Sequence, residues 1–323
     1  MARGFLLGLL RAGAVVFGVV TLTFPLLHLA PGDPVQRLLG PSAGPEQIEA
    51  GRHALGLDRP LPVQYAAWLG RAIRGDFGGS IAQGRPAAAL LAEAWPATAL
   101  LILLSLTLSW LGGIVIGALQ ANTRRRGVDT AASLLTVGLN AMPSYWLGLV
   151  LVMVFTYQLR WLPAFGAAGV DAEFLDGPGR LVDRLRHLAL PLVTLTLIGI
   201  GGAARFSRAA MLALREAPFL VGARARGLGE PRVVLRHQLR SALVPVVTLL
   251  GLSLPALFSG AVFVEAIFGW PGVGQVLVQS VVARDYPVVM AAATISAVLV
   301  VAGNLLAEVL VSLVDPRVRH AAS

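Results

Sequence analysis

The chain has 323 residues, of which 56% are hydrophobic and only 13% are charged, and its formal net charge is +9. A soluble globular domain carries about 25% charged residues, so this composition excludes an ordinary soluble protein and indicates a membrane protein. The sequence contains neither cysteine nor lysine. Their absence excludes disulfides, thiolate chemistry, a lysine Schiff base and a Walker A phosphate-binding loop, which requires a lysine. If the protein uses ATP, another chain must bind it.

Six long runs without Asp, Glu or Arg are candidates for spanning helices, which need about 20 mostly apolar residues. They are Ala12–Ala30, Ala94–Thr123, Thr130–Leu159, His187–Ala204, Ser241–Val264 and Tyr286–Ala307. We expect the fourth run to continue towards Leu212 and the sixth to Val314. The first run is longer than the apolar core of a secretory signal, so we expect it to be retained as a helix.

The arginines gather in alternate loops, and this sets the expected orientation. They are in excess at both termini and in residues 123–130 and 205–240, whereas the intervening segments are balanced in charge. Basic loops stay on the cytoplasmic side of a membrane, so we expect both termini and these two loops to be cytoplasmic. Segment 31–93 is then external, with helix-like stretches at Pro45–Leu55 and Val63–Ile73. The same bias explains the net charge without nucleic acid.

The densest basic segment, residues 205–240, holds eight arginines against two acids. Pro218 and Pro231 bracket a piece that predicts a short helix, which Gly227 would end with a positive φ. The arginines after it are spaced four residues apart, as on one face of an amphipathic helix that runs into the fifth span. These are Arg232, Arg236 and Arg240. From the residues alone, a lipid-facing loop and a docking element for a cytosolic partner both remain open.

Several motifs occur in a recognisable order along almost the whole chain. Residues 223–247 read ARARGLGEPRVVLRHQLRSALVPVV. The others are LAPGDP (29–34), PEQIEAGRHALGLDRPLPVQYAAWL (45–69), GDFGGS (75–80), AMPSYWLG (141–148), LRWLPAFG (159–166), EAIFGWPGVGQ (265–275), RDYP (284–287), NLLAE (304–308) and DPRVR (315–319). Together they resemble the B-type subunit of the dipeptide/oligopeptide/nickel family of ABC-importer permeases. Residues 223–247 resemble its conserved cytoplasmic EAA loop, although Arg226 replaces a usual Lys and Ser241 a usual Asn.

The resemblance implies an all-α membrane protein with six transmembrane helices in the type I ABC-importer permease fold. It implies a cytoplasmic N-terminus and first span (1–30), a large external segment (31–93) and a permease core (94–323). The partners implied are a second homologous permease, two cytosolic ATPase subunits that bind ATP and Mg, and an extracytoplasmic substrate-binding protein, all at a bacterial or archaeal cytoplasmic (inner) membrane. The cargo implied is di- or oligopeptides, with nickel, glutathione or another small solute as alternatives.

The loop 205–240 then couples the chain to an ATPase. The coupling residues implied are Ala223, Arg224, Ala225, Arg226, Gly227, Leu228 and His237. We expect Arg224 and Arg226 to meet acidic or carbonyl groups of the partner, and the later arginines to lie at lipid headgroups.

Two acids, Glu265 and Glu308, are the closest to the bilayer interior, where ionisable groups are costly and often functional. Each lies within a turn or two of the end of its span, so interfacial placement, packing and a role in the pathway all remain open. Asn304 precedes Glu308 by one helical turn and shares its helix face.

Other classes of function receive less support from the sequence. The spans contain no paired carboxylates, GxSxG or HExxH motif, and the five histidines have no metal-binding spacing. We therefore predict no catalytic, metal or cofactor site in this chain. A secondary transporter that works without ATPases remains the main rival, and transport by the chain alone would favour it.

Overall fold

The computed structural model describes residues 2–123 and 125–314, and all regular elements in them are helical. Four helices are long and apolar enough to cross a membrane, and the number rises to six if each of two bent helix pairs is one span. This confirms the predicted all-α membrane class. Contacts divide the chain into two compact units, residues 1–98 with 271–302 and residues 99–270 with the remainder. The predicted regions (1–30, 31–93 and 94–323) are consecutive in the chain, whereas each of these units combines segments that are distant in sequence.

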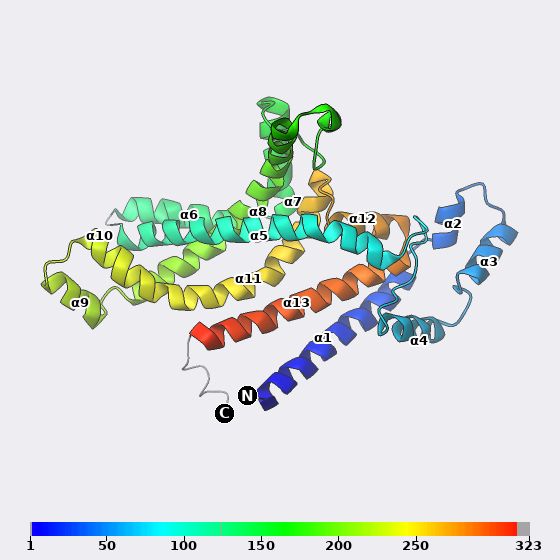
Figure 1. The fold of residues 1–323 in the computed structure, drawn as a ribbon, viewed down its shortest axis with the longest axis horizontal. Helices are drawn as coiled ribbons and strands as arrows, with labels where there is room; N and C mark the ends of the chain where they lie inside the picture. The colour runs from blue at the N-terminus through cyan, green and yellow to red at the C-terminus, as the bar shows by residue number, and fades with distance from the viewer. Residues whose placement is uncertain (1, 124, 315–323) are drawn as a thin grey trace. The chain divides into compact units, whose positions relative to one another are not determined.

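The first unit is built from helices at both ends of the sequence (Figure 1). It contains α1 (Ala2–Leu29), α2 (Pro34–Leu39), α3 (Pro45–Ala54), α4 (Leu61–Ala72), the start of α5 (Ala87–Asn122), α12 (Val273–Ala283) and most of α13 (Tyr286–Val314). Helices α3 and α4 confirm the two helix-like stretches predicted in segment 31–93. The short helices α2 and α12 were not predicted. Helices α1, α4 and α13 pack together through buried Phe24, Trp68 and Met290.

A buried carboxylate fastens the segment after α4 to the start of α13. Asp285 is 1% exposed. It accepts hydrogen bonds from the backbone N–H of Ile81 at 3.0 Å and of Ala82 at 3.3 Å, and from the Ser80 hydroxyl. A buried carboxylate needs such donors, because an unpaired charge is very costly inside a protein. The motifs GDFGGS and RDYP, about 200 residues apart, therefore meet at one structural anchor.

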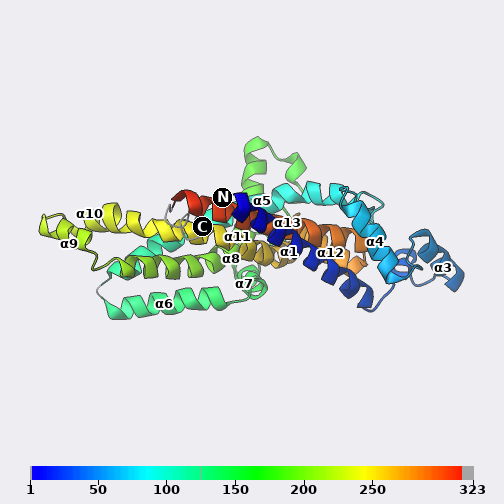
Figure 2. The same ribbon diagram turned by 90° about the horizontal axis from the view of Figure 1, so that it is seen from below.

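The second unit contains the remaining helices (Figure 2). They are the rest of α5, α6 (Arg126–Ala141), α7 (Ser144–Leu151), the π-helix η1 (Val152–Gln158), the 3-10 helix η2 (Ala172–Phe174), α8 (Gly177–Ala213), α9 (Pro218–Ala225), α10 (Glu230–Arg232), the π-helix η3 (Val233–Gln238) and α11 (Leu239–Phe268). Helix α8 reaches Ala213, which confirms the predicted extension of the fourth span. The last helix, α13, also reaches Val314 as predicted.

Helices α5 and α8 approach closely because two glycines of α5 lie against the backbone of α8. A Cβ added at Gly113 would lie 2.8 Å from the Ala204 nitrogen, and one added at Gly117 would lie 2.6 Å from the Ala204 carbonyl oxygen. The two glycines are four residues apart, the small-xxx-small spacing that lets helices pack closely in membranes. Any larger side chain at either position would push the helices apart.

The third predicted span, Thr130–Leu159, is not one straight helix. Helix α6 ends at Ala141, and the α7–η1 segment leaves it at an angle of 105°. The bend lies at Met142, whose backbone is extended with φ −74° and ψ 133°, just before Pro143. Proline disfavours helical geometry in the residue before it and has no N–H to donate. The apolar run alone could not show this break, although the Met-Pro step marks it.

Candidate functional site

The basic segment forms the short helix α9, which begins at Pro218 and ends at Ala225. Gly227 follows it with φ +79°. The N–H of Gly227 donates to the Arg224 carbonyl at 2.9 Å, and the N–H of Leu228 donates to the Ala223 carbonyl at 3.3 Å. This pair of bonds is the Schellman arrangement that closes a helix end with a left-handed residue. The predicted short helix and the positive φ of Gly227 are both confirmed.

The inner face of α9 packs against an apolar cluster formed within the same segment of the chain. Leu220 and Ala223 from α9 pack against Val233 at the start of η3, and all three are fully buried. Leu214 and Leu228 are partly buried against the same cluster. Helix α9 is therefore held by an apolar cluster, although the surrounding segment is strongly basic.

The outer face of α9 is exposed and partly apolar. Phe219 is 44% exposed and Val221 is 54% exposed. Ala225, Arg226 and Gly227 are exposed at the end of the same helix. Monomeric proteins scatter single apolar side chains on the surface, but here two of them share a short capped helix with a cation. The exposed face of α9 therefore combines apolar side chains with a cation.

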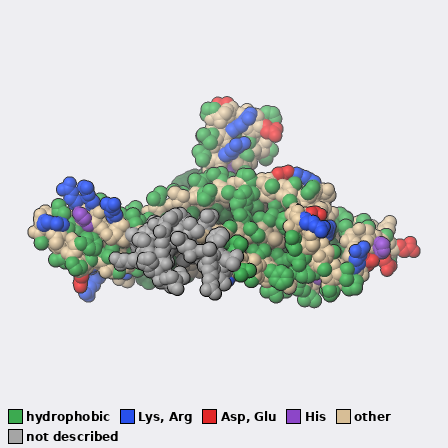
Figure 3. Space-filling model, turned by 60° about the horizontal axis from the view of Figure 1, so that its bottom comes forward, with side chains coloured by type: hydrophobic (Ala, Val, Ile, Leu, Met, Phe, Trp, Pro, Cys, Tyr) green, Lys and Arg blue, Asp and Glu red, His purple; other side chains and the backbone are tan. Residues whose placement is uncertain are grey.

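The arginines divide into those held within the segment and those left exposed. Arg224 Nε donates to Glu230 Oε1 at 2.8 Å, and its Nη1 donates to the Arg215 carbonyl at 3.4 Å. Arg224 thus has an acid of its own chain six residues away, and its expected contact with a partner stays a prediction. Arg226 is exposed, and among the described residues it has no ion pair. Figure 3 shows arginine side chains grouped at the end of the molecule that carries α9 and α10.

After Gly229 the chain runs as an unbroken helix from α10 through η3 into α11. The expected amphipathic α-helix contains a π-helical turn, in which residues five apart share a face. Val233 and Gln238 are five apart, and both are buried. The Gln238 amide donates to the Met211 carbonyl of α8 at 2.8 Å. His237 is half-buried, and the three arginines of the predicted stripe (Arg232, Arg236 and Arg240) are exposed.

A second polar contact in this unit joins α6 to α8. Arg208 forms a two-pronged ion pair with Asp129, with its Nε 3.0 Å from Oδ1 and its Nη2 2.7 Å from Oδ2. One feature of the sequence points to this pair, since Asp129 is the only acid beside a run of arginines. Neither contact was predicted, and nothing in the sequence around Gln238 indicates its bond to α8.

Of the three candidate pathway residues, the structure describes the side chains of Glu265 and Asn304. Glu265 is fully buried in the last turn of α11. Asn304 is half-buried on α13. Glu308 lies on the same helix, but its side chain is outside the described residues. Within residues 2–123 and 125–314, no group of three or more His, Cys, Asp or Glu side chains could hold a metal ion.

Comparison with known protein families gives matches along almost the full length. The family described as "Binding-protein-dependent transport system inner membrane component" matches residues 113–320. Its N-terminal companion, "Binding-prot-dependent transport system membrane comp, N-term", matches residues 1–101. The two matches leave only a short stretch within α5 between them.

Curated relatives align over nearly the entire chain. The oligopeptide transport system permease protein AppB of Bacillus subtilis is 39% identical over 308 residues, covering 95% of this chain and 96% of its own. The di/tripeptide transport system permease protein DppB of Pseudomonas aeruginosa is 36% identical, covering 94% and 95%. The glutathione transport system permease protein GsiC of Escherichia coli K12 is also 36% identical, covering 98% and 97%.

Two solved structures share the fold. One is an amino acid ABC transporter with histidines, with a TM-score of 0.51 and 16% identity, covering 69% of this chain and 94% of that one. The other is the inward-facing MetNI methionine ABC transporter, with a TM-score of 0.54 and 17% identity, covering 71% and 97%. At this identity the likeness shows the fold, which is that of type I ABC-importer permeases.

Proposed function

Since this chain belongs to the family of binding-protein-dependent transport system inner membrane components, we propose that it is a permease subunit of an ATP-driven importer of di- and oligopeptides. The relatives named as oligopeptide and di/tripeptide permeases support this cargo, because they align from end to end. The chain would enclose the transport path together with a second, homologous permease subunit. An extracytoplasmic binding protein would deliver the cargo, and segment 31–93 would contribute to that contact.

Within this complex, α9 is the element that docks on a cytosolic ATPase subunit. The observation that carries this assignment is a short capped helix with a buried inner face and an exposed outer face of Phe219, Val221 and Arg226. A helix seated in this way transmits displacement to the helices beneath it instead of yielding locally. ATP and Mg would be bound by two such ATPase subunits, because a chain without lysine cannot supply a Walker A lysine.

Glutathione is the second candidate cargo. The glutathione permease of Escherichia coli is 36% identical over 315 residues, close to the identity of the di/tripeptide relative. Glutathione is itself a peptide-like solute, so the same path would accommodate it. Which cargo enters the complex would depend largely on the binding protein.

The test is to co-express the chain with a second permease, an ATPase pair and a binding protein from the same organism and to purify the assembly. We expect a second permease and an ATPase pair to co-purify, and the reconstituted complex with its binding protein to import a labelled tripeptide at the expense of ATP. Preferential import of glutathione would favour the second candidate. A chain that purifies alone and transports without ATP would refute the proposal.

The orientation can be tested separately, because the chain has no cysteine to remove. We propose that both termini and residues 205–240 are cytoplasmic. A single cysteine placed at position 227 should react with a membrane-impermeant reagent in inverted vesicles and stay unlabelled in intact cells. Labelling from outside would overturn this topology.

A further inference from the structure

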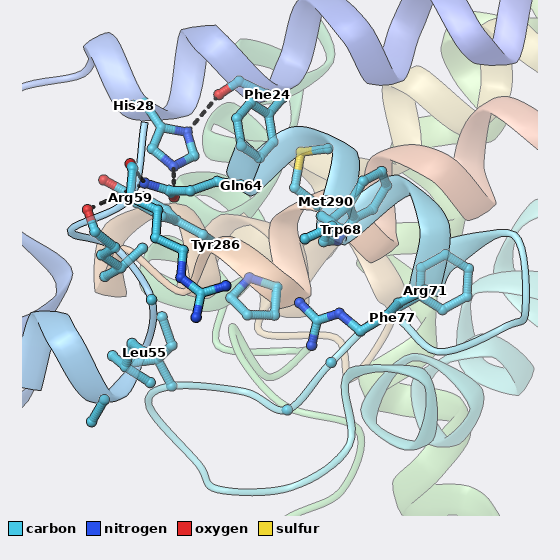
Figure 4. A pocket seen from close by; sticks show the side chains of 18 of the residues that line it. Phe24, His28, Leu55, Arg59, Gln64, Trp68, Arg71, Phe77, Tyr286 and Met290 are labelled. Carbon is cyan, nitrogen blue, oxygen red and sulfur yellow. Dashed lines mark hydrogen bonds between the residues drawn. The ribbon is translucent and has the colours of Figure 1, made fainter. Parts of the chain in front are cut away.

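A pocket of about 550 Å³ opens in the first unit, between α1, the α3–α4 connection, α4 and the start of α13 (Figure 4). Its wall includes the apolar side chains of Phe24, Trp68, Phe77 and Met290. Three of these belong to the buried cluster that joins α1, α4 and α13, and Phe77 packs against it. The wall is therefore part of the folded unit, and its volume lies within the range of about 300–1,000 Å³ typical of small-molecule sites.

Two arginines give this apolar pocket a positive charge. Figure 4 shows the guanidinium groups of Arg59 and Arg71 facing each other within it. None of the described lining residues is acidic, and neither guanidinium has an ion pair or hydrogen bond among the described residues. Elsewhere in this unit Arg52 and Arg85 each bind a carboxylate. Both arginines are exposed, and an anion bound in the pocket would be attracted to both charges.

Two of the neutral polar side chains around the arginines are already fixed by hydrogen bonds. The Gln64 amide donates to the Arg59 carbonyl at 2.8 Å and to the Leu57 carbonyl at 3.2 Å. Its oxygen lies 3.3 Å from His28 Nε2, and His28 Nδ1 lies 2.8 Å from the Phe24 carbonyl. These bonds hold the backbone that carries Arg59. By contrast, the Nε1 of Trp68 is buried and has no acceptor among the described residues.

We propose that this pocket binds small organic carboxylates that carry an apolar substituent, the chemistry of the C-terminal residue of a peptide. The carboxylate would lie between Arg59 and Arg71, since guanidinium groups match carboxylate geometry with paired hydrogen bonds. The substituent would pack on the aromatic wall. The proposal rests on the proposed function in one respect, because cargo peptides are the natural source of such carboxylates.

The experiment uses the assembled complex, without its binding protein, in nanodiscs of phosphatidylcholine. The probe is N-acetyl-L-phenylalanine, and its neutral amide is the matched control ligand; binding is followed by saturation-transfer NMR. We expect the acid to bind at least about tenfold more tightly than the amide, as a charge-assisted bond requires. Arg59→Gln and Arg71→Gln should each weaken the acid by about tenfold. Arg74→Gln is the matched protein control, because Arg74 is exposed near the end of α4 and does not line the pocket.

Equal binding of acid and amide would overturn the proposal, and this comparison needs no variant that might fail to assemble. Loss of acid binding in Arg74→Gln as large as in Arg71→Gln would also overturn it. Phosphatidylglycerol in the nanodiscs tests a lipid phosphate as the anion; displacement of the acid by that lipid would assign the pocket to headgroups instead. Peptide import is measured in parallel with the same complex in sealed liposomes, with its binding protein added. A complex that imports peptides without distinguishing the probes refutes only the pocket, whereas one that distinguishes them without importing peptides refutes only the cargo.

Discussion

Replacing Gly227 by valine tests whether the end of α9 must adopt a left-handed backbone. A Cβ added there meets nothing within 4 Å, so the expected cost is backbone strain and not a steric clash. A non-glycine residue at the φ of +79° costs about 1–2 kcal/mol. This corresponds to an equilibrium shift of about 5- to 30-fold away from the capped conformation. The apolar cluster beneath α9 should keep the protein folded in the membrane, so the loss should appear in coupling to the ATPase.

The assay is peptide-stimulated ATP hydrolysis by the reconstituted complex, with co-purification as the measure of assembly. Gly227→Asn should retain most of the coupling, because asparagine tolerates the left-handed region better than valine. Gly127→Val is the matched control, since Gly127 is a helical glycine in open space without a positive φ. Equal coupling in Gly227→Val and the unaltered protein would refute the reasoning. An equally large defect in Gly127→Val would show that the loss has nothing to do with φ.

Three further substitutions test separate parts of the fold and site. Gly117→Val should lower the stability of the second unit by about 1–3 kcal/mol through overpacking against Ala204, seen as a lower thermal midpoint; an unchanged midpoint would contradict the close approach of α5 and α8. Asp285→Asn should cost about 1.5–3 kcal/mol, because its carboxylate accepts from three donors, and should speed limited proteolysis near α13. Leu220→Ala should lower the yield of complex through a cavity worth about 2–5 kcal/mol, whereas Phe219→Ala should leave the yield intact and weaken only ATPase co-purification. Equal effects of these last two would argue against distinct inner and outer faces of α9.

The sequence predicted the long helices well because an uninterrupted apolar run leaves the backbone few alternatives in a membrane. It predicted the third span as one helix because the run from Thr130 to Leu159 contains no charge. The break at Met142 depends on a single proline, and many spanning helices tolerate proline when neighbouring groups satisfy the freed backbone. Whether a given proline bends or breaks a helix is decided by tertiary packing, which a single sequence does not contain.

The site was predictable where a local backbone rule applies and unpredictable where long-range contacts decide. Gly227 could be placed at a helix end from its neighbours, since capping depends on a few adjacent residues. The partner of Arg224 could not, because Glu230 reaches it only after the chain reverses at Gly227. The Gly113–Gly117 pair was detectable from its spacing, but its partner on α8 was not.

The attachment of α9 determines where any movement of it must go. Helix α9 packs against Val233, which lies in the helix that continues into α11. In the same helix, the Gln238 amide donates a hydrogen bond to the Met211 carbonyl near the end of α8. The two long helices are thus joined directly beside α9. Farther along α8, a Cβ added at Gly201 would lie 2.9 Å from the Asn140 nitrogen of α6, so these backbones are in close contact. Packed interfaces of this kind shift as units rather than deform continuously. A movement imposed on α9 should therefore reach α6 through α8.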